Sequence, residues 1–293
     1  MTIVSGEKDL IKKLIDKIFK LAIFFSAAVS GLLIWSILII LFYFSAPFFM
    51  ENGFEIFVTP WHPISGEYGI FPMIAGTFFI AFPALAIAFP FSLGFAIFAS
   101  ETGPYFLKKP AIFLIRLASS IPTVVYSFVG VFLFVPIVRD MSGSGSGYSI
   151  FTACLVLAIL ISPTMIFFFY DSIKSVHFSI NAGCDALGAS KSEKLTYLIL
   201  PYVKKGIYAG SFLGFGRAIG DTMISLMLAG NSISFPSSVW DSARTLTAHI
   251  GLVMAADYDS PEFRSIFACG LILYFSTAAL SLCANYIYKG DKE

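Results

Sequence analysis

Long apolar runs separated by short polar segments dominate the chain. Each run reaches the length of about 20 residues that a helix needs to cross the hydrocarbon core of a bilayer. We therefore predict an all-α integral membrane protein. The pattern predicts six transmembrane helices, at residues 20–44, 70–99, 111–136, 150–170, 206–230 and 264–288.

The composition agrees with this pattern. Of the 293 residues, 57% are hydrophobic and only 13% are charged, whereas soluble domains carry about 25% charged residues. The four cysteines are scattered, with no CxxC pair and no histidine at ligand spacing. We expect buried free thiols and no metal site.

Residues 1–19 form a polar cytoplasmic segment ahead of the first span. Apolar side chains at positions 10, 11, 14, 15, 18 and 19 share one helical face, against five lysines at positions 8 to 20. Two interpretations are open: an amphipathic helix lying on the membrane surface, or the start of the first span itself. We expect no signal peptide, because the apolar run is too long and has no small-residue cleavage pattern.

The distribution of lysine and arginine predicts the orientation. With a cytoplasmic N-terminus, all 14 lysines fall on the cytoplasmic side, and only Arg139, Arg244 and Arg264 fall on the outer side. Because cytoplasmic loops carry the excess of basic residues, both termini are expected in the cytoplasm. The loops that would then face outward are residues 45–69, 137–149 and 231–263.

Residues 173–205 form the longest cytoplasmic connection. The pattern predicts, in order, a helix at 181–187, a glycine break at Gly188, a helix at 190–200 and a proline stop at Pro201. Ser190 and Glu193 have the spacing of a capping box, in which each side chain pairs with a free amide of the other residue. Such a segment is either a docking element or an ordered loop without a partner.

An arginine and an aspartate lie within the fifth predicted span. Arg217 and Asp221 are four residues apart, and Ser225 continues their helical face. A lone charge at the bilayer centre costs about 2.5–3.5 kcal/mol on insertion scales, so this face should point into the protein. Either the pair neutralises itself and fixes a helix contact, or Arg217 offers donors to a passing anion while Asp221 holds the guanidinium.

Small and hydroxyl side chains extend this candidate pathway. Glycines at four-residue spacing let two membrane helices approach closely; these are Gly206, Gly210 and Gly214. Hydroxyls can replace water around an anion without adding charge, or bond back to their own helix. The secondary candidates for lining a path are Ser119, Ser120, Thr123 and Thr222.

The cytoplasmic segment resembles the EAA loop of permease subunits in binding-protein-dependent ABC importers. That family's pattern is Glu-Ala-Ala, three residues, Gly and a later Leu-Pro, and Gly188, Leu200 and Pro201 match it. The resemblance implies a coupling helix that sits in a cleft of an ATP-hydrolysing subunit. The implied coupling residues are Ala182, Gly183, Cys184, Asp185, Ala186, Leu187, Gly188, Ala189, Ser190, Leu200 and Pro201.

The chain departs from the family pattern at the start of this loop. The family's glutamate falls on Ala182, and its two alanines fall on Gly183 and Cys184. Asp185 is near enough to take over some of the electrostatic work. Which residue makes the polar contact with the ATPase is therefore open.

The region of the charged pair carries a second resemblance. Residues 214–231, GFGRAIGDTMISLMLAGN, resemble the Arg-Ala-hydrophobic-Gly-Glu-Thr signature of phosphate-importer permeases, in the form found in PstC-type subunits. Residues 68–77 and 117–130 agree with the same family, so the resemblance extends over about residues 66–288. Asp221 stands where the family has glutamate.

This resemblance implies a type I ABC importer permease of the MetI-like fold in the plasma (inner) membrane. Residues 66–293 would form the permease core with five spans, after a first helix and outer loop at 20–65. The implied partners are a PstA-like second permease, a dimer of PstB-like ATP-binding subunits, a PstS-like external phosphate-binding protein and membrane lipid, but no nucleic acid. ATP and Mg would be bound by the ATPase, because this chain has no phosphate-binding loop and is expected to bind no cofactor.

Three alternatives keep parts of this interpretation. The same architecture would serve another oxyanion, such as molybdate, tungstate or sulfate. An ion-coupled secondary transporter would work alone, but it would be expected to show inverted repeats, and the long cytoplasmic segment argues against it. A purely structural membrane scaffold would leave the cost of the intramembrane charges unexplained.

Overall fold

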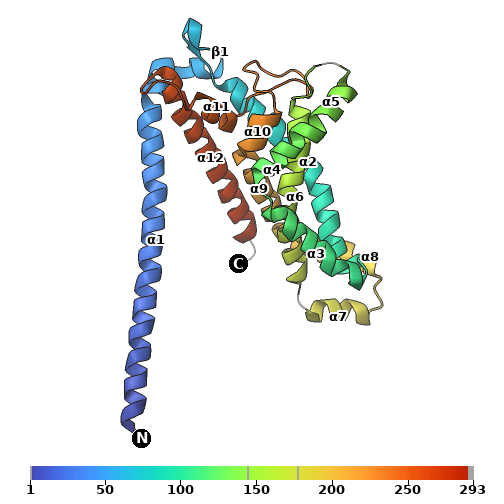
Figure 1. Cartoon of the computed structure of the whole chain (residues 1–293). Coiled ribbons are helices and arrows are strands. Elements are labelled where there is room, and N and C mark those ends of the chain that lie inside the picture. The colour runs from blue at the N-terminus through green and yellow to red at the C-terminus, as the bar shows by residue number, and fades with distance from the viewer. Residues whose placement is uncertain (1, 144, 177, 290–293) are drawn as a thin grey trace.

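The computed structural model describes residues 2–143, 145–176 and 178–289. In this part most of the chain is helical, and the only β-sheet of the described residues is a small hairpin (Figure 1). The elements are α1 (Thr2–Asn52), η1 (Gly53–Phe57), β1 (Trp61–His62), η2 (Pro63–Ser65), β2 (Glu67–Tyr68), α2 (Phe71–Ile97), η3 (Phe98–Thr102), α3 (Tyr105–Ser120), α4 (Thr123–Val129), η4 (Gly130–Phe134), α5 (Val135–Ser142), α6 (Ile150–Lys174), α7 (Phe178–Ala186), α8 (Lys191–Glu193), η5 (Lys194–Ile199), α9 (Leu200–Gly220), α10 (Met223–Leu228), α11 (Leu246–Val253) and α12 (Pro261–Lys289). η1 and η2 are 3₁₀ turns, and η3, η4 and η5 are π-helical.

Five helical stretches of the described residues are long and apolar enough to cross a membrane. They are Ile15–Phe57, Phe71–Thr102, Thr123–Ser142, Ile150–Lys174 and Pro261–Tyr286. α9 is not among them, because its 21 residues include Lys204, Lys205 and Arg217. It nevertheless packs between α6 and α12 in the bundle.

α1 is one continuous helix that begins ahead of the first predicted span. Residues 2–19 are therefore the start of the first helix, which is the second of the two open interpretations. Toward its C-terminal end α1 packs on α12, where the rings of Phe44 and Phe267 stack with centroids 4.7 Å apart. Toward its N-terminus α1 diverges from α12 (Figure 1), and side chains such as Phe25 are exposed.

The sequence pattern suggested one helix for the third predicted span, but the structure breaks it. Ile121 and Pro122 are extended, with ψ of 128° and 143°, and they separate α3 from α4. A proline has no N–H to offer the carbonyl four residues earlier and pushes the residue before it out of the helical region. That carbonyl, of Ala118, accepts a hydrogen bond of 2.7 Å from the Tyr126 hydroxyl across the break.

The fifth predicted span is also broken. α9 ends at Gly220, Asp221 is extended with ψ of 126°, and α10 begins two residues later. The Asp221 carbonyl accepts hydrogen bonds from the hydroxyls of Thr247 at 2.9 Å and Ser225 at 3.2 Å. These donors satisfy a carbonyl that an unbroken helix would have satisfied itself.

Pro201 does not stop a helix. This corrects the predicted proline stop at the end of the cytoplasmic segment. The chain is helical from Lys191 through η5 into α9, and Pro201 lies in the first turn of α9. The wider π turn of η5 directly precedes the proline, and such bulges accommodate the missing hydrogen bond. The helical segment that begins at Lys191 therefore joins α9 without a break.

Close packing between α6 and α9 depends on the glycines at four-residue spacing on α9. A methyl group on Gly210 would lie 2.8 Å from Phe168 Cβ and 2.9 Å from Phe169 Cε1, and one on Gly214 would lie 2.6 Å from Met165 Cγ. All three neighbours belong to α6. The core of the protein is centred here, where α2, α6 and α9 meet.

Replacing Gly210 with alanine is expected to destabilise the bundle. Overpacking costs about 1–3 kcal/mol, and the gain in helix propensity offsets only about 1 kcal/mol of it. Gly216→Ala is the control, since a methyl group there meets nothing within 4 Å. Thermal unfolding of the purified protein in detergent would measure both, and equal midpoints for the two variants would contradict this packing.

Candidate functional site

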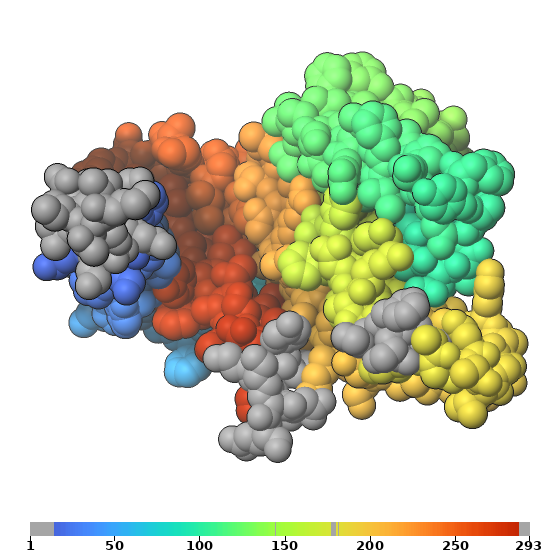
Figure 2. Space-filling view, turned by 90° about the horizontal axis from the view of Figure 1, so that it is seen from below, coloured from blue at the N-terminus to red at the C-terminus, as the bar shows by residue number. Residues whose placement is uncertain are grey.

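A cavity of about 1090 Å³ lies between α6, α9 and α12. Viewed from below, the described surface is hollowed between the red atoms of α12 and the yellow-green and orange atoms of α6 and α9 (Figure 2). Each helix lines it with one face. The polar lining residues are Thr164, Asp171, Ser172, Ser175, Tyr202, Lys205, Arg217, Thr277, Ser281 and Asn285.

Arg217 lies at the end of this cavity that is farther from the segment at 173–205. It is half-buried on the last turn of α9, and its Nη1 donates a hydrogen bond to Thr164 Oγ1 on α6. Lys205 lines the cavity 12 residues earlier on α9, about 18 Å away along the helix axis. Two cationic side chains therefore mark the two ends of the cavity.

Asp221 does not pair with Arg217, which corrects the predicted contact between residues four apart. Among the described residues, no ion pair within 4.0 Å joins them. The helix ends at Gly220, and the extended backbone at Asp221 carries its carboxylate off the face of α9. Asp221 Oδ2 instead accepts a hydrogen bond of 2.8 Å from the N–H of Ile224, in the first turn of α10.

The other predicted pathway residues lie outside the cavity. Ser119 and Ser120 are on α3 and donate to the carbonyl of Arg116 at 2.8 and 2.9 Å. Thr123 begins α4 and Thr222 lies in the break before α10. The buried Ser225 hydroxyl donates to the Asp221 carbonyl. The structure of the single chain thus brings Arg217 alone, of all the predicted pathway residues, to the cavity.

Sequence reasoning missed the α6 side of the cavity. Thr164, Phe168, Asp171, Ser172 and Ser175 recur at spacings of three and four residues, which places them on one helical face. Polar residues at this spacing within an apolar span were the available signal. Which face of α6 meets α9 was not readable from the spacing alone.

The turn at 182–190, which is predicted to face the cytoplasm, is fixed by contacts within the chain. Gly188 has φ of +74°, a conformation that disfavours other residues. Ser190 and Glu193 form the reciprocal capping box, and these hydrogen bonds hold the pKa of Glu193 below its usual value. Asp185 pairs with Lys194 at 3.2 Å, so this aspartate joins α7 to η5.

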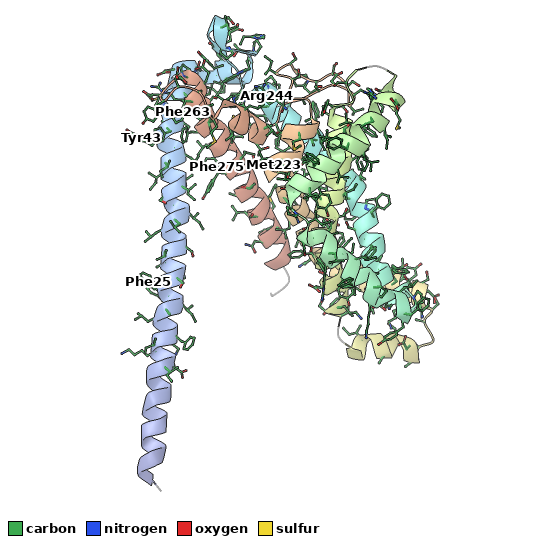
Figure 3. All side chains as sticks on the ribbon, viewed as in Figure 1. Phe25, Tyr43, Met223, Arg244, Phe263 and Phe275 are labelled. Atoms are coloured by element: carbon green, nitrogen blue, oxygen red, sulfur yellow. The ribbon has the colours of Figure 1, made fainter. Side chains whose placement is uncertain are left out.

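The loops that are predicted to face outward are held by their own charged side chains. Arg264, near the start of α12, donates to Glu51 at 2.6 Å and to Asp259 at 3.0 Å, which lowers the pKa of Asp259. Asp241 Oδ2 accepts three hydrogen bonds of 2.8 Å from the residues just before it. Figure 3 labels Phe263 at this end of α12. These acids order the outer loops.

His249 is buried on α11 and contacts the hairpin. Its Nε2 lies 3.2 Å from the hydroxyl of Ser265, and its ring packs edge-on against Trp61 with centroids 4.4 Å apart. Burial, with a smaller contribution from Arg244, lowers the pKa of His249 to about 3. The imidazole is therefore neutral at physiological pH and acts as a packing residue between α11, α12 and the hairpin.

Comparison with known proteins identifies the family. The family model for the binding-protein-dependent transport system inner membrane component matches residues 92–290. The chain belongs to this family. Its members are membrane components of ABC transporters rather than enzymes, and the family's systems include a substrate-binding protein and an ATPase.

Curated relatives of the family match most of the chain. A phosphate transport system permease protein PstC of Pasteurella multocida is 29% identical, covering 96% of this chain and 94% of the relative. A PstC of Haemophilus influenzae is 32% identical over 80% of each chain. A probable ABC transporter permease protein, YqgH of Bacillus subtilis, is 32% identical over 79% of this chain and 76% of its own.

Solved structures of the family show the fold. A chain of the MetNI methionine ABC transporter in an inward-facing conformation aligns with a TM-score of 0.54 and 16% identity, covering 75% of this chain and 94% of that one. A chain of a bacterial ABC transporter that imports alginate aligns with a TM-score of 0.58 and 13% identity, covering 90% and 96%. The fold predicted from the sequence, an all-α ABC importer permease of the MetI type, is therefore confirmed.

Asparagine at position 221 should preserve the stability of the protein, whereas alanine should not. Asparagine can still accept the hydrogen bond from Ile224, and loss of such a cap costs about 0.5–2 kcal/mol. Denaturant unfolding of Asp221→Asn and Asp221→Ala in detergent would compare them. If both variants lost the same stability, the charge of Asp221 rather than its capping bond would be what matters.

Proposed function

We propose that this chain is the permease subunit of an ATP-driven phosphate importer and that Arg217 attracts the anion. The supporting observation is the position of Arg217 at one end of the cavity between α6, α9 and α12, without a carboxylate partner. Relatives over most of the chain are named as phosphate transport permeases. A planar guanidinium offers several N–H donors at once, which suits a tetrahedral oxyanion.

The electrostatics of the cavity favour transient binding of the anion. Arg217 has no neutralising carboxylate within 4.0 Å in the described part of the chain, so an entering anion meets net positive charge. The cavity is open, so water can enter it and screen this attraction. Asp171 lines the same cavity, and its negative charge disfavours prolonged occupancy. The anion would therefore be attracted to the site without being trapped there.

A continuous helix would connect ATP hydrolysis to this site. α8, η5 and α9 form 30 consecutive helical residues from Lys191 to Gly220, a length of about 45 Å. The cytoplasmic turn at 182–190 lies at one end and Arg217 lies at the other. Closure of an ATPase on the turn would move this helix and change access to the cavity.

The remaining parts of the importer follow from this proposal. A PstA-like permease would supply the second half of the pathway, a dimer of ATP-binding subunits would bind ATP and Mg, and an external protein would deliver phosphate. This chain would bind no cofactor. The excess of lysine on one side supports cytoplasmic termini.

Replacing Arg217 with glutamine is expected to lower phosphate uptake by about tenfold or more, because a hydrogen bond to a charged group is worth about 1.5–3 kcal/mol. ATP hydrolysis should continue. The measurement is ATP-driven uptake of radiolabelled phosphate into vesicles that contain the reconstituted complex. Arg139→Gln, at an exposed arginine of the outer side, is the matched control.

Two outcomes would contradict the proposal. Undiminished phosphate uptake by Arg217→Gln would exclude Arg217 from the anion's path. Uptake of molybdate, tungstate or sulfate in preference to phosphate by the wild-type complex would keep the architecture and change the cargo.

A methyl group on Gly188 should weaken coupling to the ATPase. With φ of +74°, alanine would strain the turn, at about 1–2 kcal/mol. Gly66→Ala is the control, because Gly66 has a similar φ of +78° at the end of η2, away from this turn, and a methyl group there meets nothing within 4 Å. Phosphate transported per ATP hydrolysed would be measured for both, and an equal effect of the two substitutions would argue against a special role for this turn.

A further inference from the structure

The hydroxyl of Thr164 differs from the other serine and threonine hydroxyls of the cavity. Ser172, Ser175, Thr277 and Ser281 each donate their proton to a carbonyl of their own helix, at 2.7 to 3.0 Å. Because these protons are used within the helices, the four residues offer an anion in the cavity acceptors rather than donors. An anion gains few hydrogen bonds from hydroxyls that offer only acceptors.

Thr164 accepts a hydrogen bond and keeps its own proton available. Its Oγ1 accepts from Nη1 of Arg217, and in the described part of the chain it makes no hydrogen bond as a donor. The other N–H groups of the Arg217 side chain likewise donate to no described residue. The guanidinium and the threonine hydroxyl are thus adjacent donors at one end of the same cavity.

Given the function proposed above, we infer that Thr164 is a direct binding residue for the transported oxyanion, acting together with Arg217. A hydroxyl that accepts from a cation is polarised, which strengthens it as a donor. One oxygen of a tetrahedral oxyanion takes the hydroxyl proton while a second takes guanidinium N–H groups. Thr164 also belongs to α6, so bound anion would join α6 to α9.

Removal of the hydroxyl provides the test. In the reconstituted complex, Thr164→Val keeps the shape of the side chain without the donor, Thr164→Ala removes it without added bulk, and Thr164→Ser retains it. Phosphate transported per ATP hydrolysed is expected to fall about tenfold in the first two and to remain near the wild-type value in the third. Ser172→Ala is the matched control, since its hydroxyl is already bonded to its own helix.

Variants made in combination with Arg217→Lys distinguish direct contact of Thr164 with the anion from an indirect effect through Arg217. Arg217→Lys keeps the charge but removes the guanidinium that Thr164 contacts. If Thr164 touches the anion, adding Thr164→Val to this background lowers transport further. If the double variant transports as well as Arg217→Lys alone, Thr164 acts only through the arginine and the inference is overturned.

Failure of this inference is distinguishable from failure of the proposed function. Normal transport in both Thr164→Val and Thr164→Ala, with transport lost in Arg217→Gln, overturns the assignment of Thr164 alone. Equal losses in Thr164→Ala and Ser172→Ala also overturn it. Undiminished transport in Arg217→Gln overturns the proposed pathway and this assignment together.

Discussion

Hydrocarbon offers no partner to a backbone N–H or C=O group, so every break in a membrane helix must be satisfied within the protein. This constraint governs the two breaks near the site. At Ile121–Pro122 the hydroxyl of Tyr126 donates to the carbonyl of Ala118. After Gly220 the carbonyl of Asp221 accepts from Thr247. The breaks are therefore specific structures with dedicated side chains, not irregularities.

The second break determines the electrostatics of the cavity. Had α9 continued, Asp221 would have stood one turn above Arg217 on the same face and neutralised it. Because the chain turns extended there, the carboxylate caps α10 and the guanidinium meets Thr164 instead. The extended ψ of 126° at Asp221 thus breaks the helix between the two residues, and Arg217 lines the cavity.

The sequence predicted the membrane class, the family and most of the spans, because about 20 apolar residues admit few other structures. It did not predict how Pro201 is accommodated, since a π turn has no clear sequence pattern. Asp221 was misjudged because four-residue spacing implies a contact only within an unbroken helix. Thr164 was missed because its importance comes from a neighbour 53 residues away, and one sequence carries no direct record of that contact.

The uninterrupted helix from Lys191 to Gly220 has a consequence for how its length can vary. Each residue of an α-helix advances about 1.5 Å and turns about 100°. One inserted residue between the cytoplasmic turn and Arg217 would barely change the distance but would rotate the guanidinium out of the cavity toward another face of the bundle. Seven inserted residues would nearly restore the direction while lengthening the helix by about 10 Å. The number of residues in this segment is therefore constrained, because it sets both the length of the helix and the direction of Arg217. The identity of its surface residues can vary more freely.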